Sequence, residues 1–140
     1  MEDEEDFLMS SFTEPLIVQK LPNGTWKIVK GFRYYIGHEG SEEFIDIPEG
    51  FETDFASTPW GVRNMFPKDG PWSQAAVVHD MCYQKRLYPR KRCDQIFLEA
   101  MTILGVPWWK RRLMYSALRI GGWVSYYKNP KPQEDPYEPA

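Results

Sequence analysis

Two helical segments joined by a short turn restrict the fold of this chain most strongly. The first, SQAAVVHDMCYQKRL, is rich in alanine and valine and runs from Ser73, a suitable N-cap, to about Leu87. After the turn LYP, Pro89 opens a second helix that stops near Gly105. The second helix carries four large apolar residues at helical spacing: Phe97, Leu98, Met101 and Leu104. The short connection predicts an antiparallel helix pair, in which residues equally distant from the turn face each other.

The two cysteines of the chain are predicted to be neighbours in this pair. Cys82 lies five residues before Leu87, and Cys93 lies four residues after Pro89. Such proximity allows either a disulfide or two buried thiols. Synthesis in the cytoplasm favours thiols, whereas a virion or extracellular fate favours the bond.

The same alignment brings a histidine close to a carboxylate. Asp94 is expected to approach His79 and Tyr83, which lie four residues apart on one helix face. A histidine acts as a general base when an acceptor orients one ring nitrogen, because the other nitrogen then takes a proton from water. Asp80, on the adjacent face, is available to bind a hard cation through oxygen. The alternative is a histidine whose hydrogen bonds serve only the core.

The rest of the chain predicts an α+β fold, with a small N-terminal antiparallel sheet followed by three helices. Residues 15–36 are typical of two strands around an Asn-Gly turn at Asn23. Residues 42–55 are typical of one or two short strands with a Pro-Glu-Gly turn. Pro107 opens the third helix, which Gly121-Gly122 bends or ends. Four of its residues share one face: Trp109, Leu113, Ala117 and Ile120.

Length and composition indicate one domain with two tails. A chain of 140 residues with 42% hydrophobic and 16% aromatic residues can bury a core. Residues 1–12 begin as an acidic tail with five acids in the first six positions, residues 13–127 form the domain, and residues 128–140 are a proline-rich tail. The acidic start is unlike a signal peptide, so synthesis in the cytoplasm is expected. The net charge of −3 gives no general case for binding nucleic acid.

The segment PWWKRRL, at the start of the third helix, mixes aromatic and basic residues. Such a mixture can enter a membrane interface, which makes membrane lipid a candidate partner. We expect instead that one tryptophan is buried in the core and that the basic face is exposed.

Three motifs resemble those of a family of small phage-encoded proteins of uncharacterised function. They are FETDFASTPW, then AAVVHDMCY, then CDQIFLEAM, and the resemblance covers roughly residues 15–125. It implies a phage origin, often in genes near tail or lysis functions, and does not supply an activity.

The helix pair HDMCY…CD resembles the catalytic helices of phospholipase A2 over about 25 residues. The resemblance implies that His79 is the general base and Asp80 the calcium ligand. It implies that Asp94 is the second carboxylate, bonded to the histidine, and that Tyr83 hydrogen-bonds this carboxylate.

Other features of phospholipase A2 are matched less fully. The resemblance implies an interhelical disulfide between Cys82 and Cys93. The family has a glycine-rich calcium loop, but the corresponding TDFASTPWGVRNMFPKDGPW has glycines only at positions 61 and 70. Asp54 is a candidate for an additional calcium ligand; equally, the side chains of TDFASTP can form a turn with their own backbone.

Two main classes of function follow. The first is a calcium-dependent lipid ester hydrolase that acts on the host envelope from a virion tail. The second is a non-enzymatic tail or baseplate component whose partners are other virion proteins. A third class, an intracellular inhibitor of a host protein, would suit the acidic N-terminus.

Overall fold

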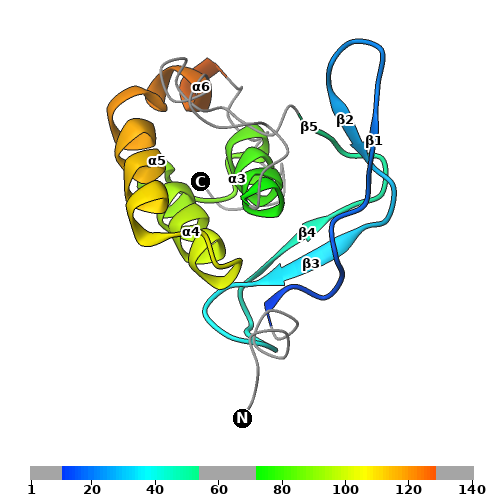
Figure 1. Cartoon of the computed structure of the whole chain (residues 1–140), viewed down its shortest axis with the longest axis horizontal. Helices are drawn as coiled ribbons and strands as arrows, with labels where there is room; N and C mark the ends of the chain where they lie inside the picture. The colour runs from blue at the N-terminus through cyan, green and yellow to red at the C-terminus, as the bar shows by residue number, and fades with distance from the viewer. Residues whose placement is uncertain (1–10, 54–71, 129–140) are drawn as a thin grey trace, which may run out of the picture.

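The computed structural model describes residues 11–53 and 72–128, which form strands followed by helices (Figure 1). A three-stranded antiparallel sheet has the order β1-β2-β5, and a two-stranded antiparallel sheet pairs β3 with β4. The strands are β1 (Val18–Lys20), β2 (Trp26–Ile28), β3 (Phe32–Tyr35), β4 (Phe44–Ile47) and β5 (Glu52–Thr53). The helices are α3 (Ser73–Lys85), α4 (Arg90–Ile103), α5 (Trp108–Gly121) and α6 (Trp123–Lys128). The predicted α+β class is confirmed, and the predicted third helix is divided at Gly121-Gly122 into α5 and the short α6.

The Asn-Gly turn joins β1 to β2 as predicted. Gly24 has a φ of +88°, and the side-chain oxygen of Asn23 accepts hydrogen bonds from Thr25 N (3.0 Å) and Oγ1 (2.7 Å). The segment expected to be the second strand is instead two strands, which separate around Gly31. A Cβ atom on Gly31 would lie 2.9 Å from the carbonyl oxygen of Ile47, so the close approach of the two backbones there requires glycine.

The helix pair has its predicted position but a different start. Pro89 and Pro107 are the N-cap residues of α4 and α5, with φ of −55° and −54°. The prediction that Ser73 caps α3 is wrong, because Ser73 is the first helical residue and Trp72 precedes it in a helical conformation without a side-chain cap. Trp72 is itself buried, so packing of its ring fixes the helix start where a cap was expected.

The core is centred on α3. Every residue of this helix from Ser73 to Tyr83 is buried, as in a helix enclosed on all sides. Figure 1 shows α3 between α4 on one side and the strands on the other. Of the predicted acidic tail, Ser11 and Phe12 are described; both are buried, and the ring of Phe12 lies 4.7 Å from that of Tyr34. Residues 1–10 and 129–140, predicted as tails, lie outside the described residues.

A carboxylate on α4 fastens the β3–β4 hairpin to the helices. The hydroxyl of Tyr34 donates to Oε1 of Glu99, and the same oxygen accepts a hydrogen bond of 2.9 Å from the backbone N–H of Gly37. Tyr34 is fully buried, so its hydroxyl needs this partner.

Helix α5 turns the face shared by Trp109, Leu113, Ala117 and Ile120 mostly toward solvent. Its buried side chains are Met114 and Leu118, whereas Trp109 and Ile120 are exposed. The expectation that one tryptophan of PWWKRRL is buried is wrong, since Trp108 is 65% and Trp109 is 50% exposed. Both indoles lie in the first turn of α5, and nine residues separate Trp109 from Leu118, which is about half a rotation around the helix.

Within residues 11–53 and 72–128, no helix combines the length and the apolar character needed to cross a bilayer.

Two aliphatic residues on α5 test its orientation. We expect Leu118→Ala to lower the free energy of unfolding by about 2 to 5 kcal/mol, because the buried side chain leaves a cavity. Ile120→Ala, two residues along at an 80% exposed position, should change it by less than about 0.5 kcal/mol. Urea unfolding followed by circular dichroism measures both, and equal losses would contradict this orientation.

Candidate functional site

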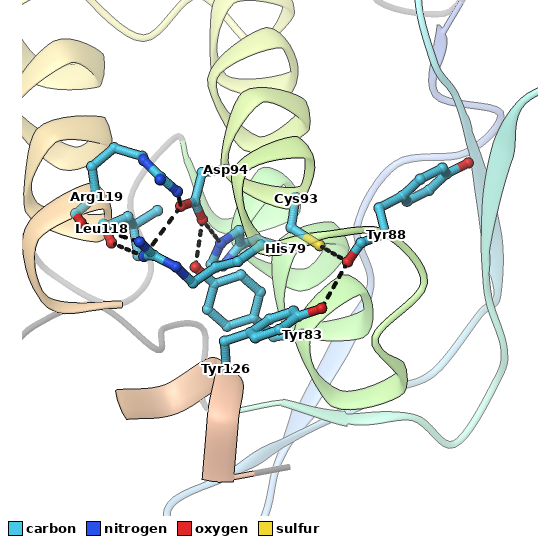
Figure 2. A network of polar contacts seen from close by, with 9 residues as sticks. His79, Tyr83, Tyr88, Cys93, Asp94, Leu118, Arg119 and Tyr126 are labelled. Carbon is cyan, nitrogen blue, oxygen red and sulfur yellow. Dashed lines mark hydrogen bonds and ion pairs between the residues drawn. The ribbon is translucent and has the colours of Figure 1, made fainter. Parts of the chain in front are cut away.

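His79, Tyr83 and Asp94 meet between α3 and α4, as the helix-pair alignment predicts. Nε2 of His79 lies 2.9 Å from Oδ1 of Asp94, and the hydroxyl of Tyr83 donates to the same oxygen at 2.5 Å. Figure 2 shows these side chains pointing toward one another from adjacent helices. The turn that aligns them begins at Arg86, whose left-handed backbone (φ 45°) ends α3 and whose N–H bonds to the carbonyls of Cys82 and Tyr83.

Two arginines complete the surroundings of Asp94, and the sequence analysis missed both. Nη1 of Arg119, on α5, donates to Oδ2 of Asp94 at 2.8 Å, and Nη1 of Arg90 lies 3.7 Å from the same oxygen. Arg90 also donates to the backbone carbonyls of Leu118 and Arg119, at 2.9 and 3.3 Å, so it links α4 to α5. The spacing of Arg90 and Asp94, four residues apart on one helix, was a usable signal. Arg119 lies 25 residues beyond Asp94 and gives no local signal.

The protonation states follow from burial and hydrogen bonding. Burial by itself would raise the pKa of Asp94, but hydrogen bonds from His79, Tyr83 and Arg119 outweigh burial and hold this pKa below its usual value. An ionised carboxylate only accepts hydrogen bonds, so Nε2 of His79 carries the proton. Burial lowers the pKa of His79 more than Asp94 raises it. His79 is therefore neutral near pH 7, and its Nδ1 atom has a lone pair that can accept a proton.

Aromatic packing holds the imidazole in place. The ring of His79 lies 4.0 Å from that of Tyr83 and 5.0 Å from that of Phe97, measured between centroids, and the residue is 3% exposed. Burial and the neighbouring Asp94 raise the pKa of Tyr83, which keeps its hydroxyl protonated as a donor. A Cβ on Gly122, between α5 and α6, would lie 2.9 Å from this hydroxyl oxygen. Only glycine therefore leaves enough space there for the Tyr83 hydroxyl.

Asp80 faces away from this group and toward the sheet. It is buried, and its Oδ2 accepts a hydrogen bond from the hydroxyl of Thr53 at the end of β5. Thr53 immediately precedes Asp54, the predicted ligand, which lies outside the described residues. Within the two described segments, no three His, Cys, Asp or Glu side chains gather in a way that could hold a metal ion. Calcium takes six to eight oxygen ligands, of which Asp80 would supply a carboxylate.

Cys82 and Cys93 are buried and are free thiols in the structure. A hydrogen bond with Cys93, and then burial, raises the pKa of Cys82 well above its usual value, which disfavours the reactive thiolate. The thiol of Cys93 donates to the backbone carbonyl of Tyr88 at 3.4 Å. The hydroxyl of Tyr126 donates to the same carbonyl at 3.1 Å and so attaches α6 to the turn between α3 and α4.

The lowered pKa of His79 makes stability depend on pH. Above about pH 6.5, the usual pKa of histidine, His79 is neutral in both the folded and the unfolded chain, so its burial does not require the loss of a proton. As pH falls below this value, His79 is protonated in the unfolded chain but stays neutral in the folded chain. The free energy of unfolding therefore decreases by at most about 1.4 kcal/mol per pH unit. Urea unfolding between about pH 7.5 and 5 should show this decrease.

The matched variants are changes at the two histidines of the chain. His79→Gln should remove most of the decrease, whereas His38→Gln, at an exposed turn, should keep it. A decrease that persists in His79→Gln would show that another group titrates there.

Comparison with known proteins identifies a family. A model of the family of proteins of unknown function designated DUF1353 matches residues 26–118, which include all of α3 and α4 and α5 as far as Leu118. No curated protein and no solved structure matches the chain. Because the matched residues are more than half of the sequence, the chain belongs to the DUF1353 family.

Proposed function

We propose that the protein is a phage-encoded hydrolase of phospholipid ester bonds with a histidine–aspartate pair like that of phospholipase A2. One observation carries the proposal: Nε2 of His79 lies 2.9 Å from a buried, ionised Asp94 across two antiparallel helices. Tyr83 donates to the same carboxylate, and Asp80 directly follows the histidine. The resemblance of HDMCY…CD to the catalytic helices of that enzyme thus has support in the arrangement of the side chains.

The mechanism assigns one proton transfer to each step. Nδ1 of His79 removes a proton from a water molecule while the water oxygen attacks the ester carbonyl carbon. When the tetrahedral intermediate collapses, the carbon–oxygen ester bond breaks, and the imidazolium returns the proton to the leaving alkoxide. Asp94 keeps Nε2 protonated throughout and stabilises the positive charge that the ring carries between the two steps.

Arg119 and Arg90 distinguish this pair from an isolated histidine–aspartate couple. Their positive charges lie 2.8 and 3.7 Å from Oδ2 of Asp94 and keep the carboxylate ionised. The arginines thus neutralise part of the negative charge of Asp94, so this carboxylate stabilises the imidazolium of His79 less strongly. We therefore expect the base to have a low pKa and to stay active below pH 6.5, the usual value for histidine.

Calcium belongs to the same proposal, with Asp80 as the protein carboxylate that would hold it. When bound, the ion would polarise the ester carbonyl and stabilise the oxyanion. Thr53 shares a hydrogen bond with Asp80, so the chain that continues into the TDFASTP motif starts beside this carboxylate. Asp54 is the proposed second ligand.

Phage origin and a place in a virion tail rest on the sequence motifs. FETDFASTPW and AAVVHDMCY are the features that support them, and the match to a family of unknown function leaves the role open. An enzyme carried by the tail would meet the phospholipids of the host envelope, which are the proposed substrate.

The central test is the loss of the general base. His79→Gln should lower the release of fatty acid from phospholipid vesicles by about 100-fold to 10,000-fold, because water must then attack without proton removal. Fatty acid is measured by titration at constant pH in the presence of calcium. His38→Gln is the control and should retain wild-type activity. Equal activity in both variants would exclude His79 as the base.

The metal is tested by chelation and at Asp80. Removing calcium with a chelator should abolish hydrolysis by the wild type, and adding calcium back should restore it. Asp80→Asn should require at least about tenfold more calcium for half-maximal activity, because the amide brings no charge to the ion. Asp46→Asn, an exposed carboxylate on β4, is the matched control. Activity that is indifferent to the chelator would reject the calcium part alone.

A second candidate is a structural component of a virion, which one observation favours. Asp94 is completely buried and accepts hydrogen bonds from two other helices, α3 and α5, as expected of a polar group that fixes a core. Such a protein would release no fatty acid, and His79→Gln would leave particle assembly unchanged. Deletion of residues 128–140 should impair assembly, because this tail would bind neighbouring subunits.

A further inference from the structure

Helix α5 turns a stripe of large apolar side chains toward solvent. Trp109, Leu113 and Ile120, here called the α5 stripe, lie within about 40° of one another around the helix axis. All three are exposed, Ile120 to 80%. Helix α6 adds exposed apolar side chains: Trp123, Val124 and Tyr127. Single exposed apolar residues are ordinary, but a continuous series on one helix marks an interaction surface.

The helices that carry the stripe have charged residues of one sign. Residues 100–128 contain no Asp or Glu, although the whole chain has a net charge of −3. The same segment holds five cations: Lys110, Arg111, Arg112, Arg119 and Lys128. A partner that complements this region is therefore anionic at its surface and apolar beneath it.

A cavity beside the stripe has a lining suited to an anionic group. Its volume is about 290 Å³, and it lies between α4 and α5. The lining residues are Leu98, Thr102, Arg111, Arg112, Tyr115 and Ser116. Arg111 uses one N–H for the carbonyl of Val106 at 2.9 Å, and a guanidinium has five N–H donors. Guanidinium and hydroxyl groups together are the donors that bind phosphate.

We propose that α5 and α6 dock the protein on an anionic phospholipid bilayer, with the cavity between α4 and α5 holding the phosphate of one headgroup. The α5 stripe would lie at the boundary between headgroups and acyl chains, where tryptophan and leucine side chains are stable, and Lys110 and Arg112 beside it would face the headgroups. A nucleic acid would use the cations but not the stripe. The inference rests on the proposed function, since it names the surface that brings this site to its substrate.

Helix α5 also connects the docking surface to the histidine–aspartate pair. Arg119, which donates to Asp94 at 2.8 Å, is adjacent to Ile120 in the stripe. One face of the helix end therefore contacts the catalytic carboxylate while the next residue faces the bilayer. A protein seated through α5 would hold its catalytic pair within one helix diameter of the lipid surface.

Sedimentation with vesicles tests the docking surface without requiring catalysis. The full chain is mixed with vesicles of phosphatidylglycerol and phosphatidylcholine, or of phosphatidylcholine alone. Wild type should bind the anionic vesicles at least about tenfold more strongly, and about 0.5 M salt should remove most of this preference. Trp109→Gln and Ile120→Gln should each lower the partition coefficient about tenfold, and Arg112→Gln about fivefold.

The controls separate docking from catalysis and from self-association. Val29→Gln, an exposed aliphatic residue on the sheet side, should bind like wild type. His79→Gln should also bind like wild type. Wild-type protein that binds the vesicles but releases no fatty acid would reject the proposed catalysis and keep the docking surface. Two results would overturn the docking proposal. One is equal sedimentation with both vesicle types; the other is a dimer that Ile120→Gln dissociates while vesicle binding is unchanged.

Discussion

A carboxylate that has no contact with solvent determines how the helices of this protein fit together. Asp94 is 0% exposed, and an unpaired charge in such a place would cost several kcal/mol. Its partners come from three helices: His79 and Tyr83 from α3, Arg90 from α4 itself, and Arg119 from α5. None of these helices can shift along its neighbour without leaving the charge uncompensated. The contact with Asp94 also gives His79 its tautomer, and burial in the same core keeps the ring neutral, so stability and proposed chemistry share one network.

The two sides of helix α5 have different roles. Its inner side packs Met114 and Leu118 into the core and sends Arg119 to Asp94, and its outer side carries the stripe. Helix α6 likewise makes two contacts with the turn between α3 and α4. The hydroxyl of Tyr126 donates to the carbonyl of Tyr88, and the guanidinium of Arg86 lies over the ring of Tyr126. The C-terminal helices are therefore part of the site and not an appendix to it.

Local spacing was sufficient to predict the helix pair, the Asn-Gly hairpin and the meeting of His79 with Asp94. Each depends on residues close in sequence or on a turn too short to allow alternatives. The burial of a tryptophan at the start of α5 was predicted wrongly because both sides of this helix carry apolar residues, and only contact with α4 decides which of them are buried. Arg119 was missed for a similar reason, because no residue near it in sequence indicates that it contacts a buried carboxylate on another helix. The failed cap at Ser73 arose because the packing of Trp72 outweighed a favourable local residue.

The hydrogen bond between Tyr34 and Glu99 joins residues 65 positions apart. This separation determines the order in which parts of the fold can form during synthesis. The β3–β4 hairpin leaves the ribosome long before α4 exists, so the tyrosine hydroxyl must stay hydrated until its acceptor arrives. Final closure of the sheet onto the helices thus waits for the second half of the chain. A nascent protein halted before residue 99 would expose the apolar side of its hairpin to chaperones.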